Sequence, residues 1–205
     1  MPCPTWSLQA WDTCPGSRNL DGSAVDACKI CYATQGFYHM PDAKKIRAFN
    51  KEDWKRSDWV YDMIQAIGDN KYFRWFDSGD IYSYDLAVKI WKVVRNTPHT
   101  QHWIPTRAYK DPAIRIVLMN IASLPNACVR LSSDSIMGER VSLDGFNDSS
   151  ILPDYGDKEG KNICMAYTRG GKCGDCRDCW NKDIQTIFYV AHGQRAKKVY
   201  RQLEV

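Results

Sequence analysis

Residues 72–80 read Tyr-Phe-Arg-Trp-Phe-Asp-Ser-Gly-Asp, and this stretch decides the fold. The aromatic side chains of residues 72–76 predict a buried strand. The polar and glycine residues that follow, 77–80, predict a tight turn. Ser83 is then the expected N-cap of a helix that ends near Asn96. A strand, a turn and a helix in this order make the first half of a βαβ unit.

The same alternation continues on both sides of this stretch. Further strands are predicted over residues 6–11, 101–106, 127–131 and 184–190, and further helices over residues 41–50, 57–68 and 111–124. Short connections between alternating strands and helices predict right-handed crossovers and a mostly parallel sheet.

This count of elements limits the architecture. Five or six strands are too few for a closed eight-stranded barrel of about 250 residues. We therefore expect an α/β fold: a partial, open β/α barrel of five to six mostly parallel strands, in a single domain over residues 1–205. Residues 136–183 break the alternation because they are rich in Gly, Asp and Ser. We expect them to form an irregular, cysteine-rich insertion before the last strand.

Composition excludes several classes of protein. The 205 residues are 44% hydrophobic and 25% charged, which is typical of a globular domain and not of a disordered chain or a coiled coil. A net charge of +4 is too small to indicate nucleic-acid binding by itself. No apolar run approaches the roughly 20 residues of a membrane span, and the start has no basic-then-apolar leader. We expect a cytoplasmic protein with no membrane partner.

Cysteine is the residue type that departs from the average. The odd total of nine and the expected reducing compartment both argue against a disulfide framework. Seven cysteines fall in two groups, an N-terminal group of Cys14, Cys28 and Cys31 and a C-terminal group of Cys164, Cys173, Cys176 and Cys179. Cys3 and Cys128 have no partner nearby in the sequence, and Cys128 is expected to be a small buried apolar residue.

The C-terminal group has the spacing C-x8-C-x2-C-x2-C, which predicts a metal site. The glycines among these cysteines, Gly170, Gly171 and Gly174, let the backbone wrap around a compact centre. The C-x2-C-x2-C run resembles the opening of a bacterial ferredoxin motif, whereas structural zinc more often takes two separated C-x2-C pairs. An iron–sulfur cluster is therefore favoured, with zinc as the alternative.

The N-terminal group has the spacing C-x13-C-x2-C and offers only three thiols. On a cubane cluster, three cysteines leave one iron free to bind a substrate or cofactor. Three alternatives remain open: the two groups share one site, Cys28 and Cys31 are redox-active, or these cysteines are buried without a role.

Polar residues follow several of the predicted strands. Asp77, Ser78, Gly79 and Asp80 come after one strand, Arg107 after the next, and Ser132 to Asp134 after a third. Because active sites of such sheets lie at the carboxyl ends of the strands, we expect these residues to converge on a cofactor. The carboxylates can bind a cation or an amine, and Arg107 can bind a carboxylate or phosphate. The alternatives are ordinary turn chemistry and a solvated arginine.

The histidines show no metal-ligand spacing, and His99 and His102 are expected at the surface. Basic residues concentrate at Lys44, Lys45 and Arg47 and in the tail, at Arg195, Lys197, Lys198 and Arg201. Such a run is more often a solvated helix face than a nucleic-acid patch, so nucleic acid is a partner of second rank.

Three blocks carry a resemblance to a known family. Thr13-Cys14-Pro15-Gly16-Ser17 with Cys28-Lys29-Ile30-Cys31-Tyr32-Ala33 resembles the opening of the phage-encoded gene product 88 family. The segments 74–83 and 173–180 resemble its next and final blocks. The resemblance implies a viral protein in the cytoplasm of a bacterial host.

A looser resemblance connects the chain to radical S-adenosylmethionine enzymes. Those enzymes place a three-cysteine loop for a [4Fe–4S] cluster after the first strand of a partial or full barrel, and a Gly-Gly-Glu after the second strand. Here a cysteine loop follows the first predicted strand, and Ser78-Gly79-Asp80 ends the second. This resemblance implies S-adenosylmethionine as a further cofactor.

These observations favour a phage iron–sulfur protein with one or two [4Fe–4S] clusters, in a redox or radical S-adenosylmethionine-like role. Its partner would be a small molecule or a redox protein. One alternative is a zinc-stabilised nucleic-acid-binding module, and another is an electron carrier without a substrate.

Overall fold

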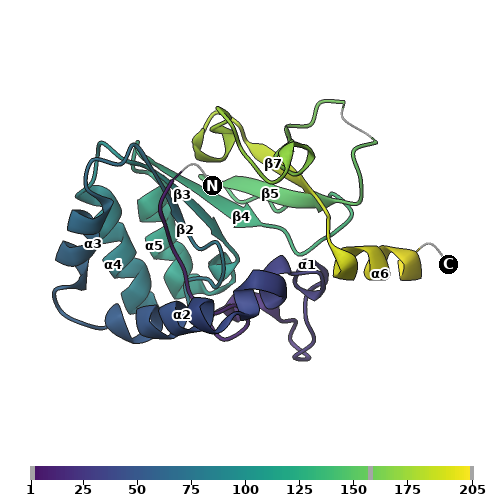
Figure 1. Ribbon diagram of the computed structural model, residues 1–205. Helices are drawn as coiled ribbons and strands as arrows, with labels where there is room; N and C mark the ends of the chain where they lie inside the picture. Colours follow the sequence, from purple (N-terminus) through teal and green to yellow (C-terminus); the bar gives the residue numbers. More distant parts are fainter. Residues whose placement is uncertain (1–2, 157–158, 204–205) are drawn as a thin grey trace.

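A computed structural model describes residues 3–156 and 159–203. It contains a seven-stranded sheet in the order β1-β2-β3-β4-β5-β7-β6, whose described strand pairs are all parallel. The sheet curls into an open half-barrel with β1 and β6 at its two edges (Figure 1). The strands are β1 (Thr5–Trp6), β2 (Tyr72–Trp75), β3 (Gln101–Thr106), β4 (Ala127–Ser132), β5 (Asn147–Leu152), β6 (Ile163–Cys164) and β7 (Thr186–Val190).

Helices cover one face of this sheet. The α-helices are α1 (Asp26–Lys29), α2 (Pro41–Asp53), α3 (Trp59–Ile67), α4 (Tyr84–Arg95), α5 (Pro112–Ala122) and α6 (Gln194–Leu203). Short 3₁₀ turns are η1 (Pro15–Ser17), η2 (Tyr32–Thr34), η3 (Gly36–His39), η4 (Ala108–Lys110), η5 (Tyr167–Arg169) and η6 (Asp178–Trp180). Figure 1 shows α3, α4 and α5 side by side on one side of the sheet and α6 next to α1. Within the described chain, no helix has the length and apolar character needed to cross a membrane.

The two central helices begin where the sequence predicts. The Ser83 hydroxyl accepts a hydrogen bond from the Leu86 amide (3.3 Å) and caps α4. The Asp111 carboxylate accepts from the Ala113 and Ile114 amides and caps α5 (2.8 and 3.1 Å). Each cap satisfies backbone N–H groups that a helix start leaves without partners.

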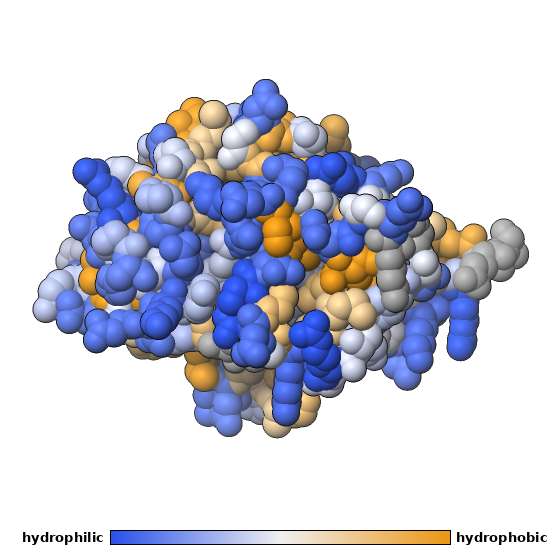
Figure 2. All heavy atoms as spheres, turned by 90° about the horizontal axis from the view of Figure 1, so that it is seen from above, coloured by the Kyte–Doolittle hydropathy of each residue, from blue (hydrophilic) through white to orange (hydrophobic). Residues whose placement is uncertain are grey.

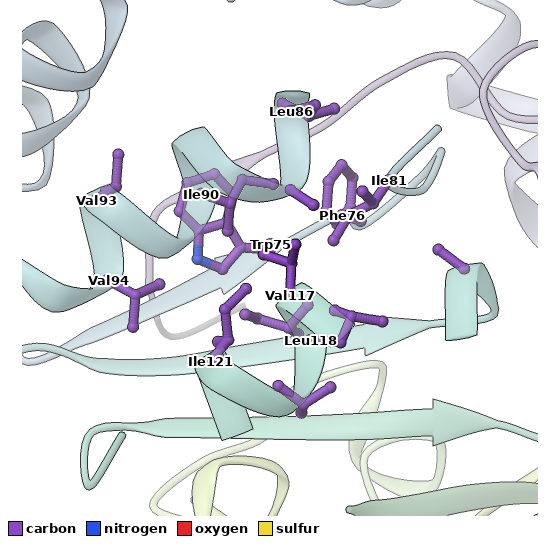
Figure 3. Close-up of a cluster of buried hydrophobic side chains, with 14 of the residues drawn as sticks. Trp75, Phe76, Ile81, Leu86, Ile90, Val93, Val94, Val117, Leu118 and Ile121 are labelled. Carbon is purple, nitrogen blue, oxygen red and sulfur yellow. The ribbon is translucent and has the colours of Figure 1, made fainter. Parts of the chain in front are cut away.

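The core lies between β2 and the helices. Trp75, Ile90 and Leu118 are fully buried, and Figure 3 shows side chains of α4 and α5 packed around the Trp75 ring. Because successive strand residues point to opposite faces, Tyr72 and Arg74 lie on the other, concave face of the sheet. There the Arg74 guanidinium stacks on Trp103 of β3, 4.4 Å from the ring centroid.

The concave face is filled by η6. Trp180 packs against Trp103 and Tyr72, with ring centroids 5.2 and 5.5 Å apart, and its Nε1 donates to the Phe73 carbonyl (3.0 Å). Arg130 of β4 is fully buried behind it and donates to the Asp178, Cys179 and Asn181 carbonyls. The cysteine-rich segment therefore covers the face that helices leave open.

The predicted fold class, an open α/β half-barrel, is confirmed, but the strand count is seven and not five or six. The two additional strands, β5 and β6, lie within residues 136–183, which the sequence predicts to be irregular. The start of β5 is polar, and its buried side chains have hydrogen-bond partners that mostly lie far away in the sequence. Buried Asp148 accepts from Arg140 (2.8 Å) and Thr186 (3.1 Å), and Asn147 donates to the Lys182 carbonyl (2.7 Å).

The strand predicted over residues 6–11 is much shorter. Only Thr5–Trp6 forms β1, although the Leu8 amide still bonds to the Ser78 carbonyl (3.0 Å). Trp11 has a φ of 71°, a left-handed conformation that ends any extended path there. The hydrophobic residues of this stretch are buried by packing and not by sheet pairing.

The prediction that His102 lies at the surface is wrong, because its side chain is fully buried on β3. Trp75 Nε1 donates to His102 Nδ1 (3.2 Å), so the ring proton is on Nε2, 2.8 Å from Thr97 Oγ1. The Thr97 hydroxyl donates a hydrogen bond to the Val93 carbonyl (2.8 Å). Burial lowers the pKa of His102 from 6.5 to about 3, so the ring is neutral at physiological pH.

This histidine predicts a pH dependence of stability. Between pH 6.5 and about 3, His102 is protonated in the unfolded chain but stays neutral in the folded chain. The free energy of unfolding therefore falls as the pH decreases through this range. The contribution is about 1.4 kcal/mol per pH unit at most. Urea unfolding at about pH 7, 6 and 5 should show a shallower pH slope for His102→Gln than for the wild type. The exposed-site variant His99→Gln should keep the wild-type slope, and equal slopes for all three proteins would contradict the assignment.

Candidate metal and cofactor site

The loop that carries the N-terminal cysteines covers the carboxyl ends of β3 and β4. The Ala27 amide donates to the Asp134 carbonyl (2.8 Å), and Lys110 Nζ donates to the Gly16 carbonyl (3.0 Å). A Cβ on Gly16 would lie 2.4 Å from the Arg107 carbonyl oxygen. Only glycine lets the loop backbone come this close to the strand end.

Local turns bring the three thiols of this loop inward. The Ser17 hydroxyl and amide both bond to the Cys14 carbonyl, and the Cys31 amide bonds to the Cys28 carbonyl (3.3 Å). Cys28 is buried on α1, and Cys14 and Cys31 are half-buried. Residues that are 17 positions apart in the sequence therefore share one place at the carboxyl edge of the sheet.

The charges of these thiols and of nearby residues act on the pKa values of the thiols. The pKa of Cys14 is raised to about 12, first by burial and then by the charge of Asp80, with smaller contributions from the other two thiols. Burial also raises the pKa of Cys28 and Cys31, and the charge of Arg107 opposes that rise. At neutral pH, a metal must displace protons from these thiols in order to bind.

These thiols do not form a coordination sphere as they stand. Across residues 3–156 and 159–203, no three cysteine, histidine or acidic side chains are placed to hold a metal ion as they stand. Ligation therefore requires the thiol side chains to rotate toward a common point.

Of the turn residues that follow β2, Ser78 and Asp80 have structural partners. Ser78 Oγ donates to the Leu8 carbonyl (2.7 Å) and accepts from Arg47 Nε (2.6 Å). The Asp80 carboxylate is buried and accepts hydrogen bonds from three groups on two strand ends, namely the Ile81 amide, Thr106 Oγ1 and the Arg107 amide. Burial raises the pKa of Asp80 to about 6. Both side chains join the strand ends to one another.

The Asp77 carboxylate has fewer and longer contacts than the side chains of Ser78 and Asp80. Its Oδ2 accepts from the Tyr38 hydroxyl (3.3 Å), while its Oδ1 is buried, lies 3.9 Å from an Arg47 nitrogen and accepts no hydrogen bond from the described residues. The preceding residue, Phe76, has a φ of 57°, which is uncommon for an aromatic residue and accompanies functional sites. Asp77 is therefore the predicted site residue best able to take a ligand.

Arg107 lies where the sequence predicts, at the end of β3. Its Nε is 3.3 Å from Asp134 Oδ1, and its terminal nitrogen donates to the Ser133 carbonyl. The same carboxylate also pairs with Lys110. Arg107 thereby connects the ends of β3 and β4 and brings positive charge beside Cys28 and Cys31.

An aromatic stack connects the surroundings of the two cysteine groups. Tyr32, next to Cys31, stacks on His192 (6.5 Å, 24°), and His192 stacks on Tyr167 near Cys164 (4.5 Å, 12°). The Tyr32 hydroxyl also donates to the Asp77 carbonyl (2.7 Å). Sequence reasoning did not find this stack, since nothing in the spacing of these residues marks them as neighbours.

The C-terminal cysteines lie against β6, β7 and η6. Cys164 is aligned with Tyr189 in the β6–β7 pairing, and the Tyr189 hydroxyl is 3.3 Å from Cys179 Sγ. The Cys176 amide bonds to the Cys173 carbonyl (3.2 Å), which folds the C-x2-C segment back on itself. Burial raises the pKa of Cys164 and Cys176, and that of Cys179 to about 12.

Two of the basic residues in the predicted segments, Arg47 and Arg195, have side-chain partners within the fold. Arg47 is buried against Ser78, unlike its exposed neighbours Lys44 and Lys45. Arg195 of α6 donates to Thr34 Oγ1 (2.6 Å) and helps to fix the N-terminal cysteine loop. Figure 2 shows α6 projecting at the right of the molecule with mostly hydrophilic side chains.

Gly79 lets the turn after β2 pack closely against residues 8 and 13. We therefore expect Gly79→Ala to be less stable than Gly22→Ala, a control at a similar φ in open space. In Gly79→Ala the new Cβ would lie 2.6 Å from Leu8 Cβ and 2.7 Å from Thr13 Oγ1, at a φ of +74°. Gly22 has a similar φ of +82° with nothing within 4 Å. Gly22→Ala should cost about 1–2 kcal/mol of unfolding free energy from backbone strain. Gly79→Ala should cost a further 1–3 kcal/mol, roughly, from overpacking. Urea unfolding tests this, and equal losses would show that the contact with residues 8 and 13 is unimportant.

Comparison with known proteins adds one finding. The family model described as Gene product 88 matches residues 1–182, a span that contains both cysteine groups and stops before β7 and α6. The chain matches no curated protein and no solved structure.

Proposed function

The chain belongs to the gene product 88 family, and we propose that it binds a [4Fe–4S] cluster through Cys14, Cys28 and Cys31 for redox chemistry. One observation carries the proposal. The loop that carries the three thiols is bonded to the carboxyl edge of a parallel sheet, where such folds place their active sites, and the charges of Cys28 and Cys31 both act on Cys14.

The donor set fits an iron–sulfur cluster. Thiolates are the ligands such clusters take, and the group offers three of them, so one iron is left for a further ligand. The positive charge of Arg107 reaches Cys28 and Cys31 and favours their thiolate forms. When bound, the cluster would supply or accept single electrons at this edge of the sheet.

The residues around the thiols define what else can bind. Asp77 Oδ1 suits an ammonium group, because it is buried, accepts no hydrogen bond from the described residues and has only a long ion pair with Arg47, at 3.9 Å. S-adenosylmethionine carries such a group, and we propose it as the ligand at this position. Ser78, Gly79, Asp80 and Arg107 would hold Asp77 and the strand ends in place around it.

The wider role follows from the same residues. The C-terminal cysteines would hold either a second cluster or zinc, and the substrate would be a small molecule or a redox protein in the cytoplasm of a phage-infected bacterium. An electron carrier without a substrate would use the same thiols, but it would give Asp77 Oδ1 no ligand.

Metal analysis tests the cluster. Anaerobic reconstitution with iron and sulfide should give a brown protein with near-equal iron and acid-labile sulfide. Replacing Cys14, Cys28 and Cys31 together with serine should remove iron and sulfide in equal amounts, because the ligands are lost. Cys128→Ser, at a buried cysteine outside both groups, should retain them. A wild-type protein that takes up zinc and no sulfide would contradict the proposal.

Ligand binding tests the role of Asp77. In the reconstituted protein, Asp77→Asn should weaken S-adenosylmethionine binding by roughly tenfold or more, because a hydrogen bond to a charged group contributes about 1.5–3 kcal/mol. Its iron content should not change. The exposed-site variant Asp42→Asn should bind like the wild type, as measured by isothermal titration calorimetry. Unchanged affinity in Asp77→Asn would remove Asp77 from the site.

A further inference from the structure

Each edge of the half-barrel has a cysteine close by. β1 and β6 are the two edge strands, and each has only two residues. Cys164 lies within β6, and Cys3 precedes Thr5 of β1 by two residues. Thr5 is aligned with Arg74, and the Arg74 amide bonds to the Pro4 carbonyl (3.1 Å). Continued by two residues, this register places Cys3 beside Tyr72, on the concave face.

The cysteine-rich segment reaches the same place from the other edge. The Arg177 guanidinium lies 5.1 Å from the Tyr72 ring centroid and donates to the Gly174 and Cys176 carbonyls (2.7 and 2.8 Å). The charges of Cys173 and Arg177 both act on the Cys3 thiol. Cys173 also acts on Cys164. The turn at residues 173–177 therefore interacts with Cys3 at one sheet edge and with Cys164 at the other.

We propose that Cys3 joins the C-terminal cysteines in a single metal–thiolate centre that ties β1 to β6 and closes the open half-barrel. The inference rests on the part of the proposed function that gives the C-terminal cysteines a metal, and it is independent of the N-terminal cluster. Zinc and an iron–sulfur cluster both take four thiolates, and Cys3 together with the C-terminal group offers five. Among the described residues no three of these side chains are placed to hold a metal as they stand, so they would have to turn toward it.

The charges on the concave face favour such a centre. The fully buried Arg130 guanidinium has five backbone carbonyls as acceptors, those of Asp148, Asp178, Cys179, Asn181 and Gln185. No carboxylate of the described residues forms an ion pair with it. A buried charge without a counter-charge is unfavourable, and a metal held by four thiolates is anionic. Cys179, whose carbonyl accepts from Arg130 Nε (3.0 Å), would bring that negative charge next to it.

Two buried donors point to the same conclusion. Trp103 Nε1 and Arg177 Nε are shielded from solvent, and neither has a hydrogen-bond acceptor among the described residues. Trp103 is only 6% exposed, and it packs between Arg74 and Trp180 on the concave face. Buried N–H groups rarely lack acceptors, and metal-bound thiolates and sulfides accept such bonds.

A metal that joins β1 to β6 would also stabilise the two short edge strands. Two-residue edge strands have few hydrogen bonds of their own, and exposed strand edges invite association with other chains. A metal that binds only the folded arrangement stabilises that arrangement, and the gain grows slowly with the length of chain it closes. Cys3 and Cys164 are 161 positions apart in the sequence, so this centre would join the start of the chain to its cysteine-rich segment.

The test compares Cys3→Ser with Cys128→Ser in a chain whose Cys14, Cys28 and Cys31 are serine, so that only the C-terminal centre is counted. Zinc, iron and sulfide are measured on the purified proteins, and metal release to a chelator is followed over time. Cys3→Ser should release metal at least about tenfold faster than the control, because even outer-shell partners of a ligand change affinity about 10–100-fold. Equal release rates, or no bound metal in the parent protein, would overturn the proposal.

Hydrogen exchange in the otherwise wild-type chain gives a second measurement if the serine background does not fold. The Arg74 and Phe76 amides bond to β1, and the Phe188 amide bonds to the Asn162 carbonyl next to β6 (2.9 Å). Chelator treatment and Cys3→Ser should both speed exchange at all three amides. Faster exchange at Arg74 and Phe76 alone would show a local effect of residue 3 and would refute the closure. If all three amides respond in this way but the N-terminal cysteines bind no cluster, only the proposed redox function is refuted.

Discussion

A parallel sheet must be covered on both faces, and this constraint governs the whole molecule. On the convex face, α3, α4 and α5 bury Trp75 and its neighbours. On the concave face, no α-helix of the described chain packs against the sheet as α3, α4 and α5 do on the other side. Trp180 and Arg130 provide the cover instead, the first by ring packing and the second by gathering the carbonyls of η6. The cysteine-rich segment is therefore part of the core.

The same constraint separates two environments for cysteine. The N-terminal group lies over the strand ends, where the charges of Asp80 and Arg107 act on its thiols. The C-terminal group lies inside the curl of the sheet, among buried arginines and aromatic rings. The first environment suits exchange of a ligand or an electron, and the second suits a permanent structural role. The stack through His192 is the structural connection between them.

Much of the fold could be predicted from local chemistry. The caps at Ser83 and Asp111 and the aromatic strand at residues 72–75 are visible in the sequence because each depends on neighbours only a few positions away. The strand at Asn147–Leu152 could not be predicted, since its buried polar residues depend on hydrogen bonds to partners in other segments, such as Arg140 and Thr186. His102 was misjudged for the same reason, because its partner Trp75 lies on another strand.

By itself, the sequence determined the alternating α/β pattern, the family and the two sets of thiols, since periodicity and spacing are local properties of the chain. Tertiary structure alone decided how these parts are used. It occupied Ser78 and Asp80 with strand-end contacts, left Asp77 Oδ1 without a hydrogen bond from the described residues, and placed Cys3 where the charge of Cys173 acts on it. These outcomes depend on the curl of the sheet, which sets distances between residues that are far apart in the sequence.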